Sequence, residues 1–417
     1  MFFLIRVFFI VSIFSIGSVQ AEPTLSLEQA EKLALDLDPA SKRFKSLAQS
    51  MQENAVAAGQ LPDPKVRFGL MNFPTDTFAR DQEPMTQLQL GVTQMFPRGD
   101  SLKIKSQKAK IMATSNEHQA ENRQRMIIKK VRMKWLELYY WLRAEEVIEE
   151  NREIFRQMVE VAQFHYSSGR RNQQDVIRAQ LELSKLDDRL LDIHTQQDKL
   201  KAELGVLIDK PVEWVKLVPD LPELGLDIDI TQMTDNLHLH PNLLAARSIV
   251  ENSQKDVSLA REAYKPGMML GVTYGARNGE NPAGIDRPDF LSVMVTLDVP
   301  LFKDKRQDRK LAASQHKLNA SQSMFDQQYL DLKQDLEKTH AELKRVQQRW
   351  QLYTSSLLPQ AKQNSEASLF AYQNDRTDFS TLMRANMSEL NTRLKSIRIN
   401  VNRVKVQARL RYLAGEE

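Results

Sequence analysis

The sequence predicts a mainly α-helical protein with a small transmembrane β part, in which one plan occurs twice. Three observations support this fold class: two very long tracts with helical periodicity, four short stretches with strand-like alternation, and an internal repeat of prolines and glycines. Each copy reads helix, strand, strand, helix, helix. The two copies together account for nearly the whole chain.

The composition argues against an enzyme and against a nucleic-acid-binding protein. The 417 residues carry 58 basic and 54 acidic side chains, interspersed, for a net charge of +4, whereas nucleic-acid binding concentrates positive charge on one face. There is no glycine-rich phosphate loop, HExxH or GxSxG motif, and no cysteine for a disulfide, a thiolate metal site or a lipid anchor. We therefore predict no catalytic residues, no cofactor, no metal site, no lipidation and no nucleic-acid partner.

Residues 1–21 are predicted to be a cleaved secretory signal. They form a short apolar run with one arginine and end in Val19-Gln20-Ala21, a small-x-Ala cleavage pattern. The alternative is a transmembrane anchor, for which the run is at the short edge of spanning length. No later segment is apolar for long enough to span a membrane as a helix, so we expect an exported protein.

The internal repeat is visible in landmarks that recur in the same order. Pro39 falls on Pro241 and Gly69 on Gly271 at one offset, and the offset then drifts by only a few residues. Two helical tracts could match by chance in their apolar spacing, but not easily in their prolines and glycines. We interpret residues 22–210 and 231–417 as two copies, joined by a proline-containing linker, 211–230.

Each copy begins with a predicted helix, over about residues 27–60 and 231–264. Ser26 with Gln29 three residues later fits a capping box at the start of the first helix. Pro64 and Pro266 are expected to end the two helices. His238 and His240 are interpreted as polar residues at the start of a helix rather than as metal ligands.

Two predicted strands follow in each copy, at about 66–73 and 88–96, then 268–277 and 290–299. Each has about the length that a tilted strand needs to cross a bilayer, and polar loops join them. The alternative is a soluble sheet with one wet face. If the strands cross a membrane, their alternation assigns these residues to the lipid-facing side: Phe68, Leu70, Leu88, Leu90, Val92, Leu270, Val272, Val293, Val295 and Leu297.

The long helical tracts run from Ser101 to about Tyr166 and from Lys310 to Tyr372, with a kink expected near Pro359. Apolar residues recur at intervals of three and four, as in helices that pack along their length. A break and a return helix follow each tract. We predict that each break is a turn between antiparallel helices, with left-handed backbone at Gly169 and at Asn374-Asp375.

Four strands in an open sheet would leave backbone groups unpaired in lipid. They also fall short of the smallest bacterial barrels, which have eight strands. Other copies of the chain must therefore complete the barrel. Two copies give eight strands, whose interior side chains would fill, whereas three give twelve and leave room for a passage. The long helices would extend such a barrel by about 100 Å.

The duplicated plan resembles the TolC family of outer membrane factors over nearly the whole mature chain. The turn pattern Y-x-x-G-x-x-x-x-x-D-V-[LI]-x-A also matches that family, here Tyr166, Gly169, Asp175, Val176, Ile177 and Ala179. The stretches LPDPKVRFGLMNFP and MTQLQLGVTQMFPRG resemble its heavy-metal efflux branch, which serves copper/silver or cobalt/zinc/cadmium pumps. The resemblance implies a homotrimeric 12-stranded outer-membrane β-barrel continued by a long periplasmic α-helical barrel.

In function, the resemblance implies a passive exit duct in the outer membrane that reaches into the periplasm. Its partners would be outer-membrane lipid, a periplasmic membrane-fusion adaptor and an inner-membrane pump of the resistance-nodulation-division (RND) type. Two alternatives stay open: an exit duct for a type I protein secretion system, and a soluble periplasmic coiled-coil adaptor. The second alternative would make the four alternating stretches soluble strands.

The turns between the long helices would form the periplasmic tip, where an adaptor meets the duct. The residues predicted to contact it are Tyr166, Gly169, Arg170, Asp175, Tyr372, Asn374, Asp375 and Arg376.

Some family members close the tip with paired aspartates, whose places hold Thr381 and Arg384 here. An acidic gate of that kind is therefore not expected. Ion pairs could close the tip instead, and the alternative is that these are solvated turn charges of little energetic weight. The candidate gate residues are Asp175, Arg178, Asp378, Thr381 and Arg384.

Overall fold

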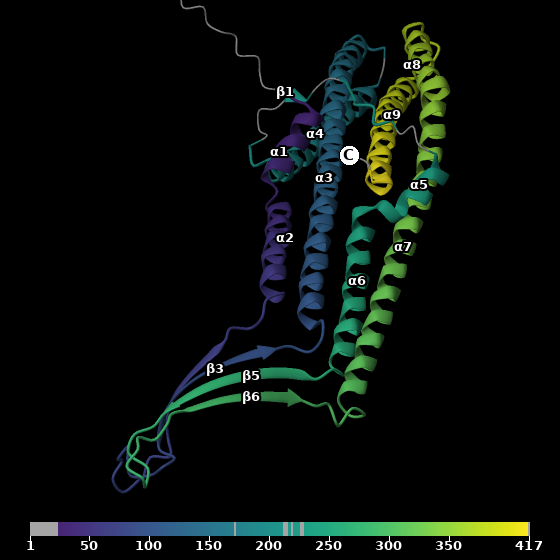
Figure 1. Ribbon diagram of the computed structural model, residues 1–417. Helices are drawn as coiled ribbons and strands as arrows, with labels where there is room; N and C mark the ends of the chain where they lie inside the picture. The colour runs from purple at the N-terminus through teal and green to yellow at the C-terminus, as the bar shows by residue number, and fades with distance from the viewer. Residues whose placement is uncertain (1–23, 171, 212–215, 218–219, 226–228, 416–417) are drawn as a thin grey trace, which may run out of the picture.

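The structure is a computed structural model that describes residues 24–170, 172–211, 216–217, 220–225 and 229–415. A bundle of long helices carries a small sheet at one end and two helical tips at the other (Figure 1). The predicted signal, 1–21, lies outside the described residues, and so does part of the predicted linker, 211–230.

The first half of the chain contains one short strand, two helices, a strand pair and a long helical hairpin. Its elements are β1 Thr24–Leu25, α1 Leu27–Leu37, α2 Pro39–Ala58, β2 Lys65–Met71, β3 Gln87–Phe96, α3 Ser101–Ser167 and α4 Gln173–Ile208.

The second half repeats this order of helices and strands, with one interruption in its long helix. Its elements are β4 Lys216–Leu217, α5 Ile230–Asn236, the 3-10 turn η1 Leu237–Leu239, α6 Pro241–Glu262, β5 Gly267–Ala276, β6 Phe290–Asp298, α7 Gln307–Leu352, the π turn η2 Tyr353–Leu357, α8 Leu358–Gln373 and α9 Phe379–Ala414. The shared order fits a duplicated plan, and the limits of the two copies remain an interpretation.

The predicted first helix of each copy is divided in the structure, so the prediction of one continuous helix is wrong. The capping box of Ser26 and Gln29 is present, but a new helix begins at Pro39 and at Pro241. Proline has no N–H to continue a helix and holds the preceding residue in extended backbone. Accordingly, Asp38 has ψ 109° and His240 has ψ 130°.

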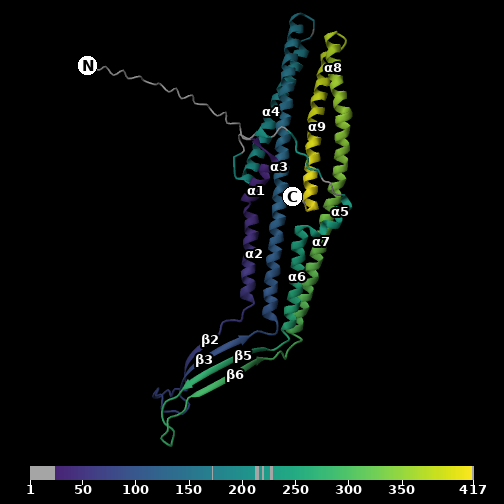
Figure 2. The same cartoon turned by 45° about the horizontal axis from the view of Figure 1, so that its top comes forward.

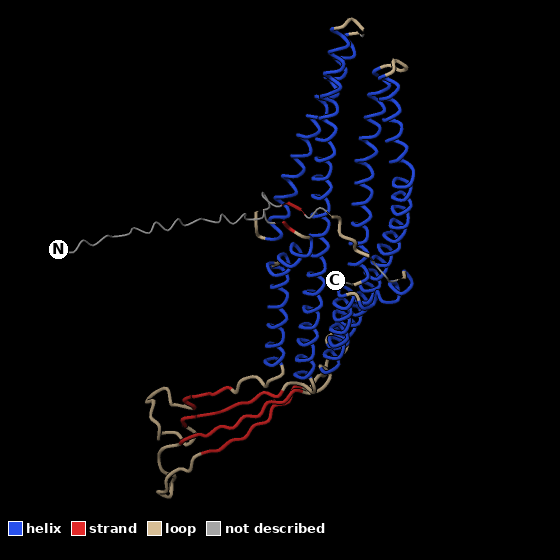
Figure 3. Tube along the Cα trace, turned by 90° about the horizontal axis from the view of Figure 1, so that it is seen from above, coloured by secondary structure: helices blue, strands red, loops and turns tan. Residues whose placement is uncertain are grey.

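The sheet is antiparallel throughout, in the order β2-β3-β5-β6. The two hairpins therefore meet along β3 and β5, one strand from each half. Val66 pairs with Val92, Val92 with Val272, and Val272 with Val293, so one row of valines crosses all four strands. The strands lie together beyond the ends of the helices in Figure 3.

The helices pack in layers along α3, which contacts α2, α4, α6 and α9. The core is divided into three clusters along the length of the bundle. The middle cluster holds Trp135, whose ring is buried and whose Nε1–H donates to the carbonyl of Leu25 at 3.1 Å. In Figure 2 the two hairpins, α3 with α4 and α8 with α9, rise side by side to separate tips.

The kink predicted at Pro359 corresponds to the π turn Tyr353–Leu357, which lies just before the proline. Pro359 has no N–H to donate to the carbonyl of Ser355, and a wider turn takes up the mismatch. The hydroxyl of Ser355 donates to the carbonyl of Gln351 at 2.7 Å. The long helix of the second half is therefore irregular where that of the first half is continuous.

Candidate functional site

The sheet has one apolar face, and all ten predicted lipid-facing residues lie on it. Residues that pair directly across strands share a face, and the pairs Phe68–Leu90, Leu90–Tyr274 and Leu270–Val295 extend this face over the sheet. Most of these side chains are open to the surroundings in the single chain: Phe68 is 74% exposed and Val293 66%, whereas Leu88 and Leu270 are partly buried. An apolar surface of this extent marks a lipid or protein contact.

The opposite face carries most of the polar side chains of the sheet and is rich in glycine, and Met71, Met95, Met269 and Met294 also lie on it. It holds Gln87, Gln89, Thr93 and Thr273, together with glycines at 69, 91, 267, 271 and 275. A Cβ on Gly91 would lie 2.9 Å from Oγ1 of Thr273, and one on Gly275 would lie 2.0 Å from Oε1 of Gln87. Glycine at these places lets the polar side chains of neighbouring strands approach closely. The sheet thus has opposite chemistry on its two sides.

The outer strands β2 and β6 pair on one side only within the described chain. Because four antiparallel strands alternate in direction, β2 and β6 run in opposite directions. The β6 edge of one copy is therefore able to pair with the β2 edge of another in an antiparallel ladder, which satisfies the edges as a closed barrel requires.

The loops between paired strands, residues 72–86 and 277–289, contact each other at the free end of the sheet. Arg277 Nη1 donates to the carbonyl of Pro84 at 3.1 Å, and Arg287 Nη1 donates to the carbonyl of Asp81 at 3.1 Å. These contacts join the hairpins of the two halves.

Both helical tips use the same backbone motif, with a left-handed residue one position past the C-cap of the helix. Gly169 has φ +72° and Asp375 has φ +55°. At the first tip the N–H of Arg170 donates to the carbonyl of His165 at 2.9 Å. At the second tip, the N–H of Arg376 donates to the carbonyl of Ala371 at 2.8 Å. Both ends are Schellman motifs. The predicted left-handed turn is confirmed at Gly169 and Asp375, whereas Asn374 has φ −100°.

The residues predicted to meet an adaptor are mostly on the surface of the tips. Five of these residues are exposed: Gly169, Arg170, Asn374, Asp375 and Arg376. Asp175 is half-buried in the first turn of α4. The two tyrosines differ, although the sequence places them alike.

Tyr166 is 48% exposed, whereas Tyr372 is only 6% exposed and belongs to the core below the tip. The ring of Tyr372 packs edge-on against Phe379 at 5.7 Å and His165 at 6.2 Å between ring centroids. Tyr372 therefore supports the tip from within and does not present its ring to a partner.

Three of the predicted gate residues form one cluster at the start of α9. The carboxylate of Asp378 accepts from the backbone N–H of Thr381 at 2.7 Å, and Arg384 Nη2 donates to the hydroxyl of Thr381 at 3.1 Å. Hydrogen bonds from Thr381 lower the pKa of Asp378, and the charges of Arg384 and Arg178 add to the effect. Asp378 is therefore a helix cap held in an electropositive setting.

Ion pairs between distant helices were missing from the sequence prediction. Asp38, at the start of α2, accepts from Nε and Nη2 of Arg123 on α3 at 3.0 and 2.8 Å. Farther along α3, Glu137 accepts from Nη1 of Arg398 at 2.6 Å and also pairs with Lys405, both on α9. Nothing in local spacing reveals such pairs, because their partners are far apart in the chain.

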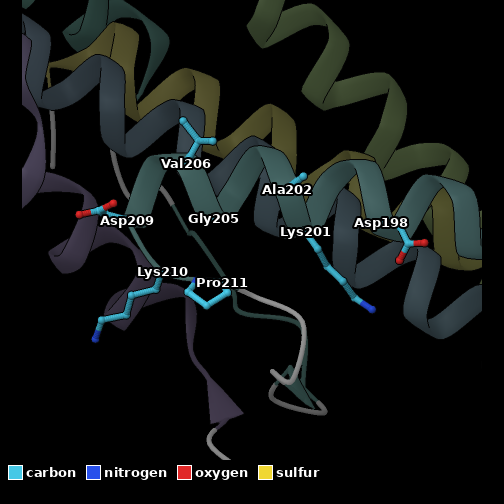
Figure 4. Close-up of a pocket in the computed structure, with 8 residues that line it drawn as sticks. All are labelled: Asp198, Lys201, Ala202, Gly205, Val206, Asp209, Lys210 and Pro211. Carbon is cyan, nitrogen blue, oxygen red and sulfur yellow. The ribbon is translucent and has the colours of Figure 1, made fainter.

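A shallow groove of about 460 Å³ lies at the end of α4 (Figure 4). The side chains of Asp198, Lys201 and Lys210 point in different directions there and do not converge on one point. Over the described part of the chain, no group of three His, Asp or Glu side chains could hold a metal ion. Nor is any helix of that part long and apolar enough to cross a membrane.

Comparison with known proteins points to channels. The family model for outer membrane efflux proteins matches residues 234–416. No curated protein matches the chain.

Several solved structures are similar over almost their whole length. The outer-membrane channel OprN is 15% identical, with a TM-score of 0.77 over 94% of this chain and 90% of that one. CusC, described in terms of transmembrane channel formation, is 13% identical, with a TM-score of 0.77 over 94% and 92%. The outer membrane protein VceC from Vibrio cholerae is 15% identical, with a TM-score of 0.77 over 94% and 96%.

At these identities the structural likeness establishes the fold, while the family match rests on the second half of the sequence. The neighbours in family and fold are channels rather than enzymes. The chain therefore has the fold of outer-membrane channels, and residues 234–416 carry the sequence pattern of the outer membrane efflux proteins.

Proposed function

We propose that the chain is the outer-membrane exit duct of a tripartite efflux system. It would passively export substrates, foremost heavy-metal cations, that an inner-membrane RND pump and a periplasmic adaptor deliver to it. The observation that carries this proposal is the sheet: one exposed apolar face, one polar glycine-rich face, and two free edges of opposite direction. A soluble adaptor has no need of such a sheet.

Three copies would close the sheet into a homotrimeric barrel of twelve strands. The polar face would line the passage and the apolar face would meet lipid. Helix α3, with 67 residues, would carry the duct about 100 Å into the periplasm. We expect no lipid anchor, because the sequence has no cysteine.

The helical tips would be the docking surface for the adaptor. Tyr166, Arg170 and Arg376 are exposed there and can contact a partner without rearrangement of the core. The opening of the duct at the tips would be controlled by the cluster of Asp378, Thr381 and Arg384. Asp175 and Arg178, which follow the tip of the first hairpin closely in the sequence, would take part.

Heavy metals are proposed as cargo because two strand-region stretches resemble the heavy-metal branch of the TolC family. These stretches are LPDPKVRFGLMNFP and MTQLQLGVTQMFPRG, which cover β2 and β3 with their flanks. A passive duct needs no tight metal site, since its cargo has to leave again.

The first test is cell fractionation combined with gel analysis before and after boiling. The duct predicts a detergent-dependent protein of the outer membrane that migrates as a trimer until it is boiled. A soluble periplasmic monomer would contradict the proposal and favour the adaptor alternative.

The second test addresses the cargo. Deletion of the gene should sensitise cells to copper and silver, or to cobalt, zinc and cadmium, and the intact gene on a plasmid should restore resistance. Unchanged metal resistance together with loss of a secreted protein would favour the type I secretion alternative.

A further inference from the structure

The connections from sheet to helix differ between the two halves of the chain. Residues 97–100 join β3 to α3, whereas the longer segment 299–306 joins β6 to α7. The shorter connection is fixed to the body: Arg98 Nη1 donates to the carbonyl of Ala263 at 2.8 Å, and the N–H of Asp100 donates to Glu262 at 2.8 Å. The longer one is exposed at every residue except Pro300. Just past its end, the hydroxyl of Tyr264 donates to the carboxylate of Asp308 at 2.5 Å.

Two large apolar side chains project from the longer connection. Leu301 is 74% exposed and Phe302 is 83% exposed. Val299 is also exposed, and Leu297 belongs to the apolar face of β6. The apolar surface of the sheet therefore continues past the last strand as far as Phe302. The connection that carries Phe302 joins β6 to α7, where the sheet meets the helices (Figure 1).

Basic residues follow directly after Phe302 in the sequence. The segment 303–310 holds five basic and two acidic side chains and is exposed except at Gln307. The carbonyl of Lys303 accepts from the N–H groups of Arg306 and Asp308 at 3.2 and 3.0 Å, so the segment is a defined turn. We call residues 299–310 the basic collar.

We propose that the basic collar binds anionic lipid headgroups at the periplasmic surface of the outer membrane. This inference rests on the proposed function, because it requires the apolar face of the sheet to lie in lipid. Leu301 and Phe302 would enter the boundary between headgroups and acyl chains, as apolar side chains do at interfaces. Lys303, Lys305 and Arg306 would then lie at the level of the lipid phosphates.

Charge argues for lipid over a second copy of the chain as the occupant. In a closed ring the nearest segment of the neighbour would be the approach to its β2 edge, residues 60–67. That segment carries Lys65 and Arg67 against Asp63 alone, so it is itself basic. It does not complement the collar, whereas an anionic headgroup does. Each basic residue near an anionic surface contributes about five-fold in binding, so three contribute on the order of a hundredfold.

The test uses the full-length protein, purified and placed in lipid nanodiscs. One set contains phosphatidylethanolamine alone and the other contains phosphatidylethanolamine with phosphatidylglycerol. The temperature at which the oligomer dissociates is measured, and bound lipids are counted by native mass spectrometry. The variants are Lys303→Gln/Lys305→Gln/Arg306→Gln and Leu301→Ser/Phe302→Ser. The matched control is Lys42→Gln/Arg43→Gln/Lys45→Gln, an exposed basic group at the end of α2 away from the sheet.

We expect phosphatidylglycerol to raise the dissociation temperature of the wild type by about 5 °C, as a ligand that binds the folded state does. The collar triple variant should lose this shift and most of the bound phosphatidylglycerol, and the control should keep both. The Leu301/Phe302 variant should dissociate at a lower temperature in both lipids. Free inorganic phosphate added to phosphatidylethanolamine discs should give no shift.

Three results would overturn the inference: a collar variant that keeps the full lipid-dependent shift, a phosphate effect equal to that of the lipid, or a collar variant that falls apart into monomers already in detergent. The last would assign the collar to the contact between subunits. Failure of the wild type to enter nanodiscs would instead refute the proposed function, so the two failures are distinguishable.

Discussion

The two halves of the chain begin their second helices at the same place with different chemistry. In the first half Asp38 caps α2 with a charged carboxylate, which accepts from the N–H of Ser41 at 2.8 Å and is held by Arg123. In the second half His240 caps α6 with a neutral ring, whose Nδ1 accepts from the N–H of Asn242 at 3.2 Å. Its Nε2 lies 3.1 Å from the carbonyl of Tyr412. Proline follows both caps.

The tips show the same relation between halves. Their backbones end in the same motif, but the left-handed position holds glycine in one and aspartate in the other. The tyrosine near each tip is exposed in the first half and buried in the second. A repeated backbone device therefore does not fix the environment of the side chains on it. That environment depends on which helices pack nearby, and four predictions test this.

The largest effect is expected at the two tyrosines. Tyr372→Ala should lower the free energy of unfolding by about 4 kcal/mol, because it leaves a cavity among Phe379, His165 and their neighbours. Tyr166→Ala should change it by no more than about 0.5 kcal/mol and should weaken binding of the adaptor instead. Denaturant unfolding and pull-down of the adaptor measure the two effects. Equal effects on stability would show that the tips are alike after all.

The next effect concerns the charged cap. Asp38→Ala should cost about 3 kcal/mol, since it removes the cap and leaves Arg123 without its carboxylate. Asp38→Asn keeps a capping oxygen and should cost less. A double variant that also replaces Arg123 by Met separates the cap from the ion pair. If Asp38→Ala and Asp38→Asn unfold at the same denaturant concentration, the capping oxygen is not a reason for the cost, and the loss comes from the ion pair with Arg123.

The neutral cap predicts a pH dependence. Burial lowers the pKa of His240 from 6.5 to about 4. The unfolded chain therefore binds a proton more readily than the folded one, and stability falls as the pH drops from about 6.5 towards 4. Between pH 7 and pH 5 the loss should be about 2 kcal/mol. His240→Asn should remove this part of the pH dependence.

The charged cap provides the contrast within the same experiment. Burial alone would raise the pKa of Asp38, but hydrogen bonds from Arg123 and Ser41 outweigh it and lower the pKa below 3.8. Its contribution is therefore present above pH 3.8 and is lost only as the pH falls below that value. A wild-type profile that is flat between pH 7 and pH 5 would contradict the assignment of His240.

The smallest effect is expected at the left-handed residues. Gly169→Ala should cost about 1 kcal/mol, because a Cβ is unfavourable at φ +72°. Gly169→Asp introduces the residue type found at the left-handed position of the second tip. It should lower the stability by less than Gly169→Ala does, since aspartate tolerates this backbone better than alanine. Thermal dissociation of the oligomer measures both. If alanine is as stable as glycine, backbone strain does not govern this turn.

The elements could be predicted from the sequence where their signal is local. The four strands begin and end within about two residues of the predicted ranges, because each alternates cleanly and is bounded by Pro, Gly and Asn. Helix α3 was predicted from the absence of proline and glycine over its whole length. The division of the first helix at Pro39 and Pro241 was missed, although both prolines were used as landmarks of the repeat. Their effect on the preceding residue would have revealed it.

The sequence by itself determined the order of the elements, the apolar face of the sheet and the left-handed turn at each of the two tips. Each of these depends on neighbours within a few residues, through side-chain periodicity or the allowed φ of a single residue. Only the tertiary structure decided that Tyr372 is buried while Tyr166 is not, and that Asp38 meets Arg123 while His240 meets Tyr412. These partners lie far apart in the chain, and packing of the helices alone brings them together.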